Sequence, residues 1–308
     1  MFLGIDIGGT KTAVIRADDD GKLLDRIAFP TKGVDETLSK VIEVAKGFEK
    51  PRAAGISCGG PLDEKNGLIL SPPNLIGWDE VPVCQILSEA LGCPVGLCND
   101  ANACALAEWK FGAGVGTQNM IFLTFGTGLG AGLILDGRLY SGTNGNAGEA
   151  GHMSLTDFGP VGYGKAGAFE GWCSGGGLRQ IGRTLALEKL QCGKTCAYCK
   201  TREDLDRVSA KVMADAAREG DETALEAYRL CGEKLGYGLS ILIDLFNPEA
   251  IVIGSIFVRS EDLLRPHMEK VIEKLTLPAS RKVCRVLPAK LGEQIGDYAA
   301  VSVAMMQV

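Results

Sequence analysis

Two short stretches combine glycines with hydroxyl side chains in a pattern that suits phosphate binding. The first, "DIGGTKT", begins at Asp6, and the second, "FGTGLGAG", begins at Phe125. Glycines let backbone N–H groups converge on an anion without clashes from Cβ atoms, and threonine hydroxyls add donors. We interpret the two stretches as a pair of turns that hold the β- and γ-phosphates of ATP from opposite walls of a cleft. The predicted phosphate-binding residues are Gly8, Gly9, Thr10, Lys11, Thr12, Gly126, Thr127 and Gly128.

The second stretch also looks like the glycine fingerprint of a dinucleotide-binding site, because Gly126-x-Gly128-x-x-Ala131 follows an apolar run. That fingerprint requires a strand, a glycine turn and then a helix whose N-terminus holds the pyrophosphate. Here a short apolar run and an Asp136-Gly137 turn follow the glycines, which favours a strand. An oxidoreductase with a Rossmann fold is therefore disfavoured.

Two acidic residues are placed to support phosphoryl transfer. Asp100 follows an apolar strand at the start of a helix, where a carboxylate can take the proton of an acceptor hydroxyl as general base. The alternative is a simple helix cap. Asp6 follows a buried strand and could face Mg²⁺ through water, since Mg²⁺ prefers carboxylates, phosphate oxygens and retained waters. The alternative for Asp6 is an acid in a hairpin turn.

Alternating apolar runs, helical spacing and glycine turns predict the elements that position these residues. Both glycine turns lie in the same arrangement of strand, turn, strand, acid–glycine turn and strand, so the chain reads as two α/β halves. Strands are expected at 2–7, 13–17, 22–30, 53–60, 93–100, 120–126, 131–140, 250–255 and 284–289, and helices at 35–50, 101–112, 173–190, 203–218, 222–246, 260–275 and 295–308.

The predicted boundary between the halves is the glycine-rich spacer at 112–116. The N-terminal domain is expected to comprise residues 1–114 plus about 293–308, with the sugar-side loops and the catalytic aspartate. Residues 115–292 are expected to form the C-terminal domain, with the second phosphate turn, the adenosine side and a Glu-x-x-His loop.

Six segments in this order make the chain resemble the ROK family of sugar kinases, within the actin-like ATPase superfamily. They are "DIGGTKT" at 6–12, "GISCGGPLD" at 55–63, "NDANACALAE" at 99–108, "TFGTGLGAG" at 124–132, "GNAGEAGHM" at 145–153 and "VIGS" at 252–255. The resemblance covers essentially the whole chain. It implies two actin-like (RNase H-like) α/β domains with a mixed sheet in each and a cleft between them.

The resemblance also implies an activity: transfer of the γ-phosphoryl group of ATP to the 6-hydroxyl of a hexose, most simply glucose, with Mg²⁺. Kinases for N-acetylmannosamine, N-acetylglucosamine or another hexose are alternatives, and a non-catalytic sugar-sensing regulator is a more distant one. Gly254 and Ser255 are implied to lie against the nucleoside. The implied sugar-binding residues are Gly60, Asn99, Asp100, Glu149, His152 and Glu170.

The sequence departs from the family at its usual zinc motif. Aligned on Glu170, the three cysteine positions are occupied by Val161, Tyr163 and Ala168, so a structural zinc is not expected there. A displaced zinc site at Cys192, Cys196 and Cys199 is an alternative to free or redox-active thiols at those positions.

Composition narrows the partners further. The 308 residues carry a net charge of −6, which argues against binding to nucleic acid through phosphates. The N-terminus lacks the features of a signal peptide and no apolar run is long enough to cross a bilayer, so a cytoplasmic location without a membrane partner is expected. A DNA-binding segment ahead of the first strand is not expected either. The expected ligands are a small sugar and ATP, and the expected assembly is a homodimer.

Overall fold

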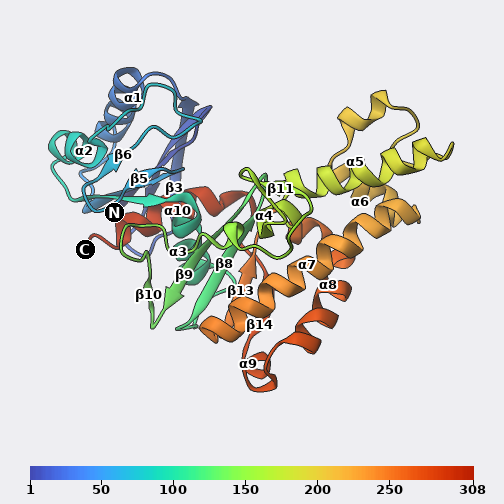
Figure 1. Cartoon of the computed structure of the whole chain (residues 1–308). Coiled ribbons are helices and arrows are strands. Elements are labelled where there is room, and N and C mark those ends of the chain that lie inside the picture. The colour runs from blue at the N-terminus through green and yellow to red at the C-terminus, as the bar shows by residue number, and fades with distance from the viewer. The chain divides into compact units, whose positions relative to one another are not determined.

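The computed structural model describes all residues from Met1 to Val308 (Figure 1). The chain forms two compact units, which are described separately. The first comprises Met1–Gln118, Gly132–Gly148 and Lys290–Val308, and the second comprises Asn119–Ala131 and Glu149–Ala289. The domain boundaries inferred from the sequence assign 132–148 to the other half and stay a prediction.

The first unit is built on a mixed five-stranded sheet with the order β3-β2-β1-β4-β7. Strand β1 pairs antiparallel with β2 and parallel with β4. The sheet therefore has an antiparallel part, β1 to β3, and a parallel part, β1, β4 and β7. The strands are β1 (Phe2–Ile7), β2 (Lys11–Ala17), β3 (Leu23–Pro30), β4 (Ala53–Cys58) and β7 (Val95–Asn99), with a small hairpin of β5 (Leu62–Asp63) and β6 (Leu68–Ile69).

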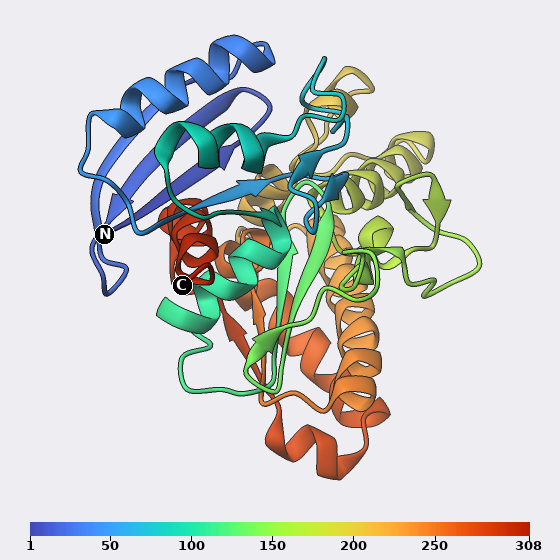
Figure 2. The same ribbon diagram turned by 90° about the vertical axis from the view of Figure 1, so that its left-hand side faces the viewer.

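Helices cover both faces of this sheet because successive strand residues point to opposite sides. Val14 packs in the cluster that contains α1 and α2, whereas its neighbours Ala13 and Ile15 pack with Val301 of α10. Figure 2 shows α1, in blue, and α10, in red, on opposite sides of the strands. The helices are α1 (Val34–Lys46), α2 (Val83–Leu91), α3 (Asp100–Phe111) and α10 (Ile295–Met305).

Helix α10 lies unusually close to the sheet because β4 presents a glycine to it. A Cβ atom on Gly55 would lie 2.1 Å from the backbone nitrogen of Ala304. Only a residue without a side chain allows this approach. The C-terminal helix is thereby packed against the first strands of the chain, and both ends of the sequence belong to one unit.

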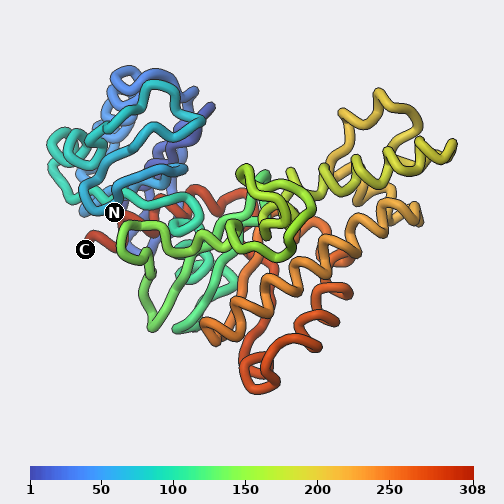
Figure 3. The backbone as a smooth tube through the Cα atoms, in the orientation of Figure 1, coloured from blue at the N-terminus to red at the C-terminus, as the bar shows by residue number.

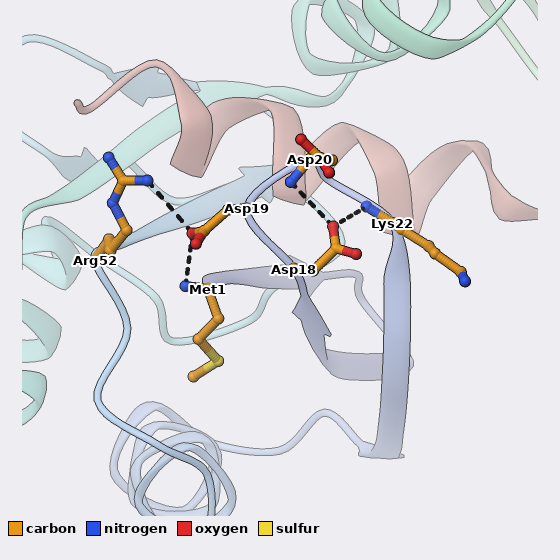
Figure 4. A network of polar contacts seen from close by, with 6 residues as sticks. All are labelled: Met1, Asp18, Asp19, Asp20, Lys22 and Arg52. Carbon is orange, nitrogen blue, oxygen red and sulfur yellow. Dashed lines mark hydrogen bonds and ion pairs between the residues drawn. The ribbon is translucent and has the colours of Figure 1, made fainter.

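The β2–β3 turn carries a small polar network at the surface (Figure 4). The Asp18 carboxylate accepts hydrogen bonds from the backbone nitrogens of Asp20 and Lys22, at 3.0 and 2.9 Å. Asp19 pairs with the Met1 ammonium group at 2.8 Å and with Arg52 at 3.3 Å. These contacts confirm the acid–glycine turn predicted at "DDDG".

The second unit contains most of a mixed sheet with the order β10-β9-β8-β13-β14. Strand β9 follows the second glycine turn directly, which confirms that a strand and not a helix comes after these glycines. The chain passes from the second unit to the first within β9. The strands are β8 (Met120–Phe125), β9 (Leu129–Leu135), β10 (Arg138–Leu139), β13 (Ala250–Ile253) and β14 (Arg285–Pro288), with a separate hairpin of β11 (Val161–Gly162) and β12 (Lys165–Ala166).

Long helices make up much of the rest of the second unit. Helices α7 and α8 pack along one another, as the tube in Figure 3 shows in orange. The α-helices are α4 (Phe169–Trp172), α5 (Gly175–Gln191), α6 (Ala210–Arg218), α7 (Glu222–Phe246), α8 (Ile256–Leu275) and α9 (Pro278–Val283), and the 3₁₀ turns of the chain are η1 (Ala150–His152), η2 (Glu203–Arg207) and η3 (Gly292–Gln294). No helix is both long and apolar enough to span a bilayer.

Several helix predictions differ from the structure, and the helix expected at 35–50 already ends at Lys46. The single helix expected at 203–218 is split, because Ser209 has an extended backbone and its side chain caps α6 by accepting a hydrogen bond from Val212. Helix α8 begins at Ile256, four residues before the expected start, and is kinked at Ser260, where φ is −135°.

A buried carboxylate joins the first and the last of the three chain segments that build the first unit. Glu108, near the end of α3, is fully buried. Its side chain accepts hydrogen bonds from the backbone nitrogens of Ala113 at 2.7 Å, Lys290 at 3.0 Å and Leu291 at 2.9 Å. Hydrogen bonds to a charged acceptor are stronger than neutral ones, and losing the acceptor leaves buried donors unpaired.

Replacing this acceptor tests its contribution to stability. We expect Glu108→Ala to lower the free energy of unfolding by about 3 kcal/mol or more, because three backbone donors lose a charged partner. Urea unfolding followed by circular dichroism measures the change. Glu89→Ala, at an exposed helical position on α2, is the matched control and should change stability by less than about 0.5 kcal/mol. Equal effects of the two substitutions would contradict this role of Glu108.

Candidate active site

A cavity of about 170 Å³ in the first unit gathers several of the residues singled out in the sequence. Its walls come from the end of β1, the loop after β4, the start of α3 and one further loop. The lining residues are Asp6, Ile7, Gly8, Gly9, Cys58, Gly59, Gly60, Pro72, Pro73, Asn74, Leu75 and Asp100. The structure therefore brings the first phosphate turn, the sugar-side glycine and the candidate base to one cavity.

Asp100 is presented to the cavity by the junction of β7 and α3. Asn99 caps the helix, since its side-chain oxygen accepts a hydrogen bond from the Ala101 nitrogen at 3.0 Å. Asp100 is the first residue of the helix, is exposed, and contacts the same nitrogen at 2.8 Å. Because Asn99 is the N-cap of this helix, Asp100 is not needed as the capping residue.

The sugar-side loop lies directly against these two residues. A Cβ atom on Gly60 would be 3.6 Å from the side-chain nitrogen of Asn99, and one on Gly59 would be 3.9 Å from Asp100 Oδ2. The backbone nitrogen of Asn99 also donates to Glu64 Oε1 at 2.7 Å. Asn99 is thus fixed from its backbone while its side chain faces the loop.

Asp6 lies in a cluster of acidic groups with one arginine. Arg26 on β3 bonds both carboxylate oxygens of Asp297, at 2.8 and 2.9 Å, near the start of α10. Burial and the charges of Asp297 and Asp100 together raise the pKa of Asp6 to about 6, against the opposing charge of Arg26. A partly buried carboxylate that ionises reluctantly is a good ligand for a cation, which would relieve the excess negative charge.

The first phosphate turn is held by Thr31, the residue after β3. The Gly8 nitrogen donates to the Lys11 carbonyl at 3.0 Å, and the Thr31 hydroxyl donates to the Gly8 carbonyl at 2.6 Å. Thr12 is fully buried, and its hydroxyl lies 2.8 Å from that of Thr31. Thr12 therefore supports the turn from beneath, whereas Thr10 and Lys11 are exposed.

The loop at Pro72–Leu75 was missed in the sequence. Asn74 packs onto the phosphate turn so closely that a Cβ atom on Gly9 would lie 2.5 Å from the Asn74 carbonyl oxygen. The "SPPN" turn signal marks a loop, but nothing in the local sequence says which part of the fold that loop covers.

Cys58 also lines the cavity, and its thiol is a possible nucleophile. Burial raises the pKa of the Cys58 thiol to about 12, and the negative charges of Asp100 and Asp6 contribute. The thiolate is the nucleophilic form of cysteine. Cys58 is therefore protonated at neutral pH, which excludes it as an activated nucleophile in this cavity.

The second phosphate turn is held by the N-terminus of α5. The Gly175 and Gly176 nitrogens donate to the carbonyls of Gly126 and Thr127, at 2.8 and 3.2 Å. A third first-turn nitrogen, that of Gly177, donates to the Ser174 hydroxyl at 2.9 Å. These backbone nitrogens of α5 therefore bond to the protein and do not face an anion. This contact between α5 and the turn was not predicted from the sequence.

Glu170 contacts the same turn from α4. Its Oε2 atom accepts a hydrogen bond from the Leu129 nitrogen at 3.0 Å, and a Cβ atom on Gly128 would lie only 2.6 Å from this oxygen. The phosphate turn and one predicted sugar residue are therefore adjacent in the second unit. A Cβ atom at position 128 would force the Glu170 carboxylate to move from this contact.

The Glu-x-x-His loop joins this group. Glu149 precedes the 3₁₀ turn η1, and His152 ends it, so the loop character predicted for the motif is confirmed. His152 Nε2 lies 3.7 Å from Glu149 Oε2, and both side chains are about half exposed. Between them, Gly151 packs against the Leu129 carbonyl and Glu170.

The predicted nucleoside residues lie on the other side of the turn. Ser255 precedes α8, and its hydroxyl would be 3.8 Å from a Cβ atom on Gly126. Gly254, directly after β13, donates its backbone hydrogen to the Leu123 carbonyl of β8 at 2.9 Å, which fixes the start of the loop between β13 and α8.

The three cysteines considered for a displaced zinc do not form a metal-binding group. Cys192 is exposed, whereas Cys196 and Cys199 are buried, and their thiols contact backbone carbonyl oxygens. Burial raises the pKa of the Cys196 and Cys199 thiols. No group of three or more His, Cys, Asp or Glu side chains in the structure could hold a metal ion.

Several known proteins are similar to this chain in sequence and in fold. The glucokinase of Thermotoga maritima is 32% identical over 311 aligned residues, which cover 98% of this chain and 96% of that protein. A ROK family glucokinase from Streptomyces griseus, solved in complex with glucose and AMPPNP, has a TM-score of 0.76 and 30% identity over 99% of both chains. A ROK family transcriptional regulator has a TM-score of 0.85 and 25% identity over 99% of this chain and 78% of its own.

These similarities confirm the predicted fold class of two actin-like α/β domains with a mixed sheet in each. A model of the ROK family matches residues 2–306. Since this match spans nearly the whole sequence, the chain belongs to the ROK family.

Proposed function

We propose that the chain is an ATP-dependent hexose kinase that transfers the γ-phosphoryl group to the 6-hydroxyl of a hexose, with glucose as the first candidate. The observation that carries the proposal is the cavity at which Asp6, Gly60 and Asp100 meet. It combines a phosphate turn, a carboxylate near the acceptor position and a carboxylate suited to a cation. Glucokinases at about 30% identity over the full length support the choice of glucose.

Asp100 is the proposed general base. Its carboxylate lines the cavity, and Asn99 beside it is the proposed hydrogen-bond partner of sugar hydroxyls. A base here removes the proton of the attacking hydroxyl as the bond to phosphorus forms.

Asp6 is the proposed contact of Mg²⁺, through bound water. The residues present fit this ion. Asp6 lies beside the turn at Gly8 and Gly9, and the two carboxylates near it, Asp297 and Asp100, outnumber the one nearby arginine, Arg26. When bound, Mg²⁺ neutralises charge on the transferring phosphate. The chain itself orients the carboxylate and supplies the backbone of the phosphate turn.

The remaining predicted residues stay proposals. The sugar contacts proposed in the second unit are Glu149, His152 and Glu170. These residues do not separate glucose from an N-acetylated hexosamine, so such a sugar is the alternative substrate. A homodimer in the cytoplasm remains a prediction from the sequence.

The general base can be tested by assay of ADP release over a panel of hexoses and hexosamines. We expect glucose to give turnover in the wild type and Asp100→Asn to lower kcat by about 10²–10⁴-fold, because the proton acceptor is lost while Asn99 still caps α3. Asp35→Asn, at an exposed position of α1, is the matched control and should keep wild-type turnover. If the wild type turns over no sugar, the proposed kinase function is wrong. Normal turnover by Asp100→Asn would refute its role as base.

The raised pKa of Asp6 predicts a pH dependence of stability without Mg²⁺. The folded protein holds this proton up to about pH 6, whereas the usual value of the pKa is 3.8. The free energy of unfolding should therefore fall by roughly 3 kcal/mol as pH rises from about 4 to about 6, where the folded state must give up a proton the unfolded chain has already lost.

Denaturant unfolding at several pH values, in Asp6→Asn and in wild type, measures this contribution. Asp6→Asn should lack that part of the slope, and Asp35→Asn should retain it. Identical pH profiles of Asp6→Asn and the wild type would show that Asp6 ionises normally in the folded protein.

A further inference from the structure

The hairpin β11–β12 has an unexpected residue at its tip. Its two-residue turn is Tyr163-Gly164, and both residues have positive φ, 45° and 76°. Such turns favour asparagine or aspartate followed by glycine, because most side chains are disfavoured in the left-handed region. Tyrosine at the first position therefore works against the local backbone.

Burial does not explain Tyr163 either. The residue is 83% exposed, so the hydrophobic gain from placing an aromatic ring there is small. Neither the turn nor the core therefore favours a tyrosine at this position.

The Tyr163 ring lies against His152. Their ring centroids are 5.2 Å apart at an interplanar angle of 78°, an edge-to-face contact. This geometry is favourable for aromatic pairs. From the next strand of the hairpin, the Lys165 ammonium group donates to the His152 carbonyl oxygen at 2.8 Å. The hairpin thus holds His152 by both its ring and its backbone.

The other contact of the imidazole is weaker. His152 Nε2 lies 3.7 Å from Glu149 Oε2, which is too long for a good hydrogen bond, and the side chain is 46% exposed. A ring held only at this distance can rotate. The Tyr163 contact restricts that rotation while it leaves the nitrogen that faces Glu149 uncovered.

We propose that Tyr163 is a positioning residue that fixes the His152 imidazole for contact with the sugar. The proposal rests on the proposed function, in which His152 binds the hexose. Fixing the ring before the sugar arrives removes part of the entropic cost of binding. Losing the contact should weaken sugar binding and leave the nucleotide and the chemical step unaffected.

Tyr163→Asn separates this role from a structural one, because it creates the preferred Asn-Gly turn. We expect an unchanged or higher melting temperature, together with a sugar KM raised about three- to tenfold and an unchanged KM for ATP. Tyr163→Gly, which also tolerates positive φ, should behave alike. Tyr163→Phe keeps the ring and should restore the wild-type sugar KM. Phe158→Ala removes another exposed aromatic side chain of this loop and is the control.

Proton NMR tests the ring contact without any assay of activity. The chain has only two histidines, His152 and His267, so their ring signals are easily assigned. Tyr163→Asn should shift the His152 ring protons and leave those of His267 in place. Unshifted His152 signals, or an unchanged sugar KM in Tyr163→Asn beside an active wild type, would overturn the proposal. An inactive wild type with a shifted His152 signal would instead refute the proposed kinase function.

Discussion

The first unit depends on one buried carboxylate. Three separate segments build this unit, so the chain leaves it and returns to it. Glu108 gathers backbone donors from two of these segments, at Ala113 in the first and at Lys290–Leu291 in the last. Because a buried charge is tolerated only when its partners are all in place, the same interaction that stabilises the unit also fixes where its segments meet. Helix α3 begins at Asp100 and contains Glu108 in its last turn, so it links this junction to the cavity.

The cavity itself is a place where the fold opposes stability. Asp297 is satisfied by Arg26, but Asp6 sits near both Asp297 and Asp100 and ionises at an elevated pH. A core built for stability alone would avoid such a cluster of carboxylates. Groups with perturbed pKa values concentrate at functional sites, and the Asp6 carboxylate is such a group.

The sequence allowed the glycine turns, the strand after Gly128 and the β7–α3 junction at Asp100 to be predicted, because each follows from local spacing. Other features depend on contacts between distant residues. The packing of Asn74 onto Gly9 and the support of the second turn by Gly175 join segments more than forty residues apart. Helix α2 and the break before Ser209 were missed for a different reason, since short helices and caps give weak periodic signals.

The distribution of thiols has a practical consequence. All eleven cysteines are free, but Cys192 at the end of α5 is the exposed one, and burial raises the pKa of several others. Since the thiolate is the reactive form, a maleimide at neutral pH reaches Cys192 first. The chain thus carries a natural attachment point for a fluorophore or spin label at the end of α5 in the second unit.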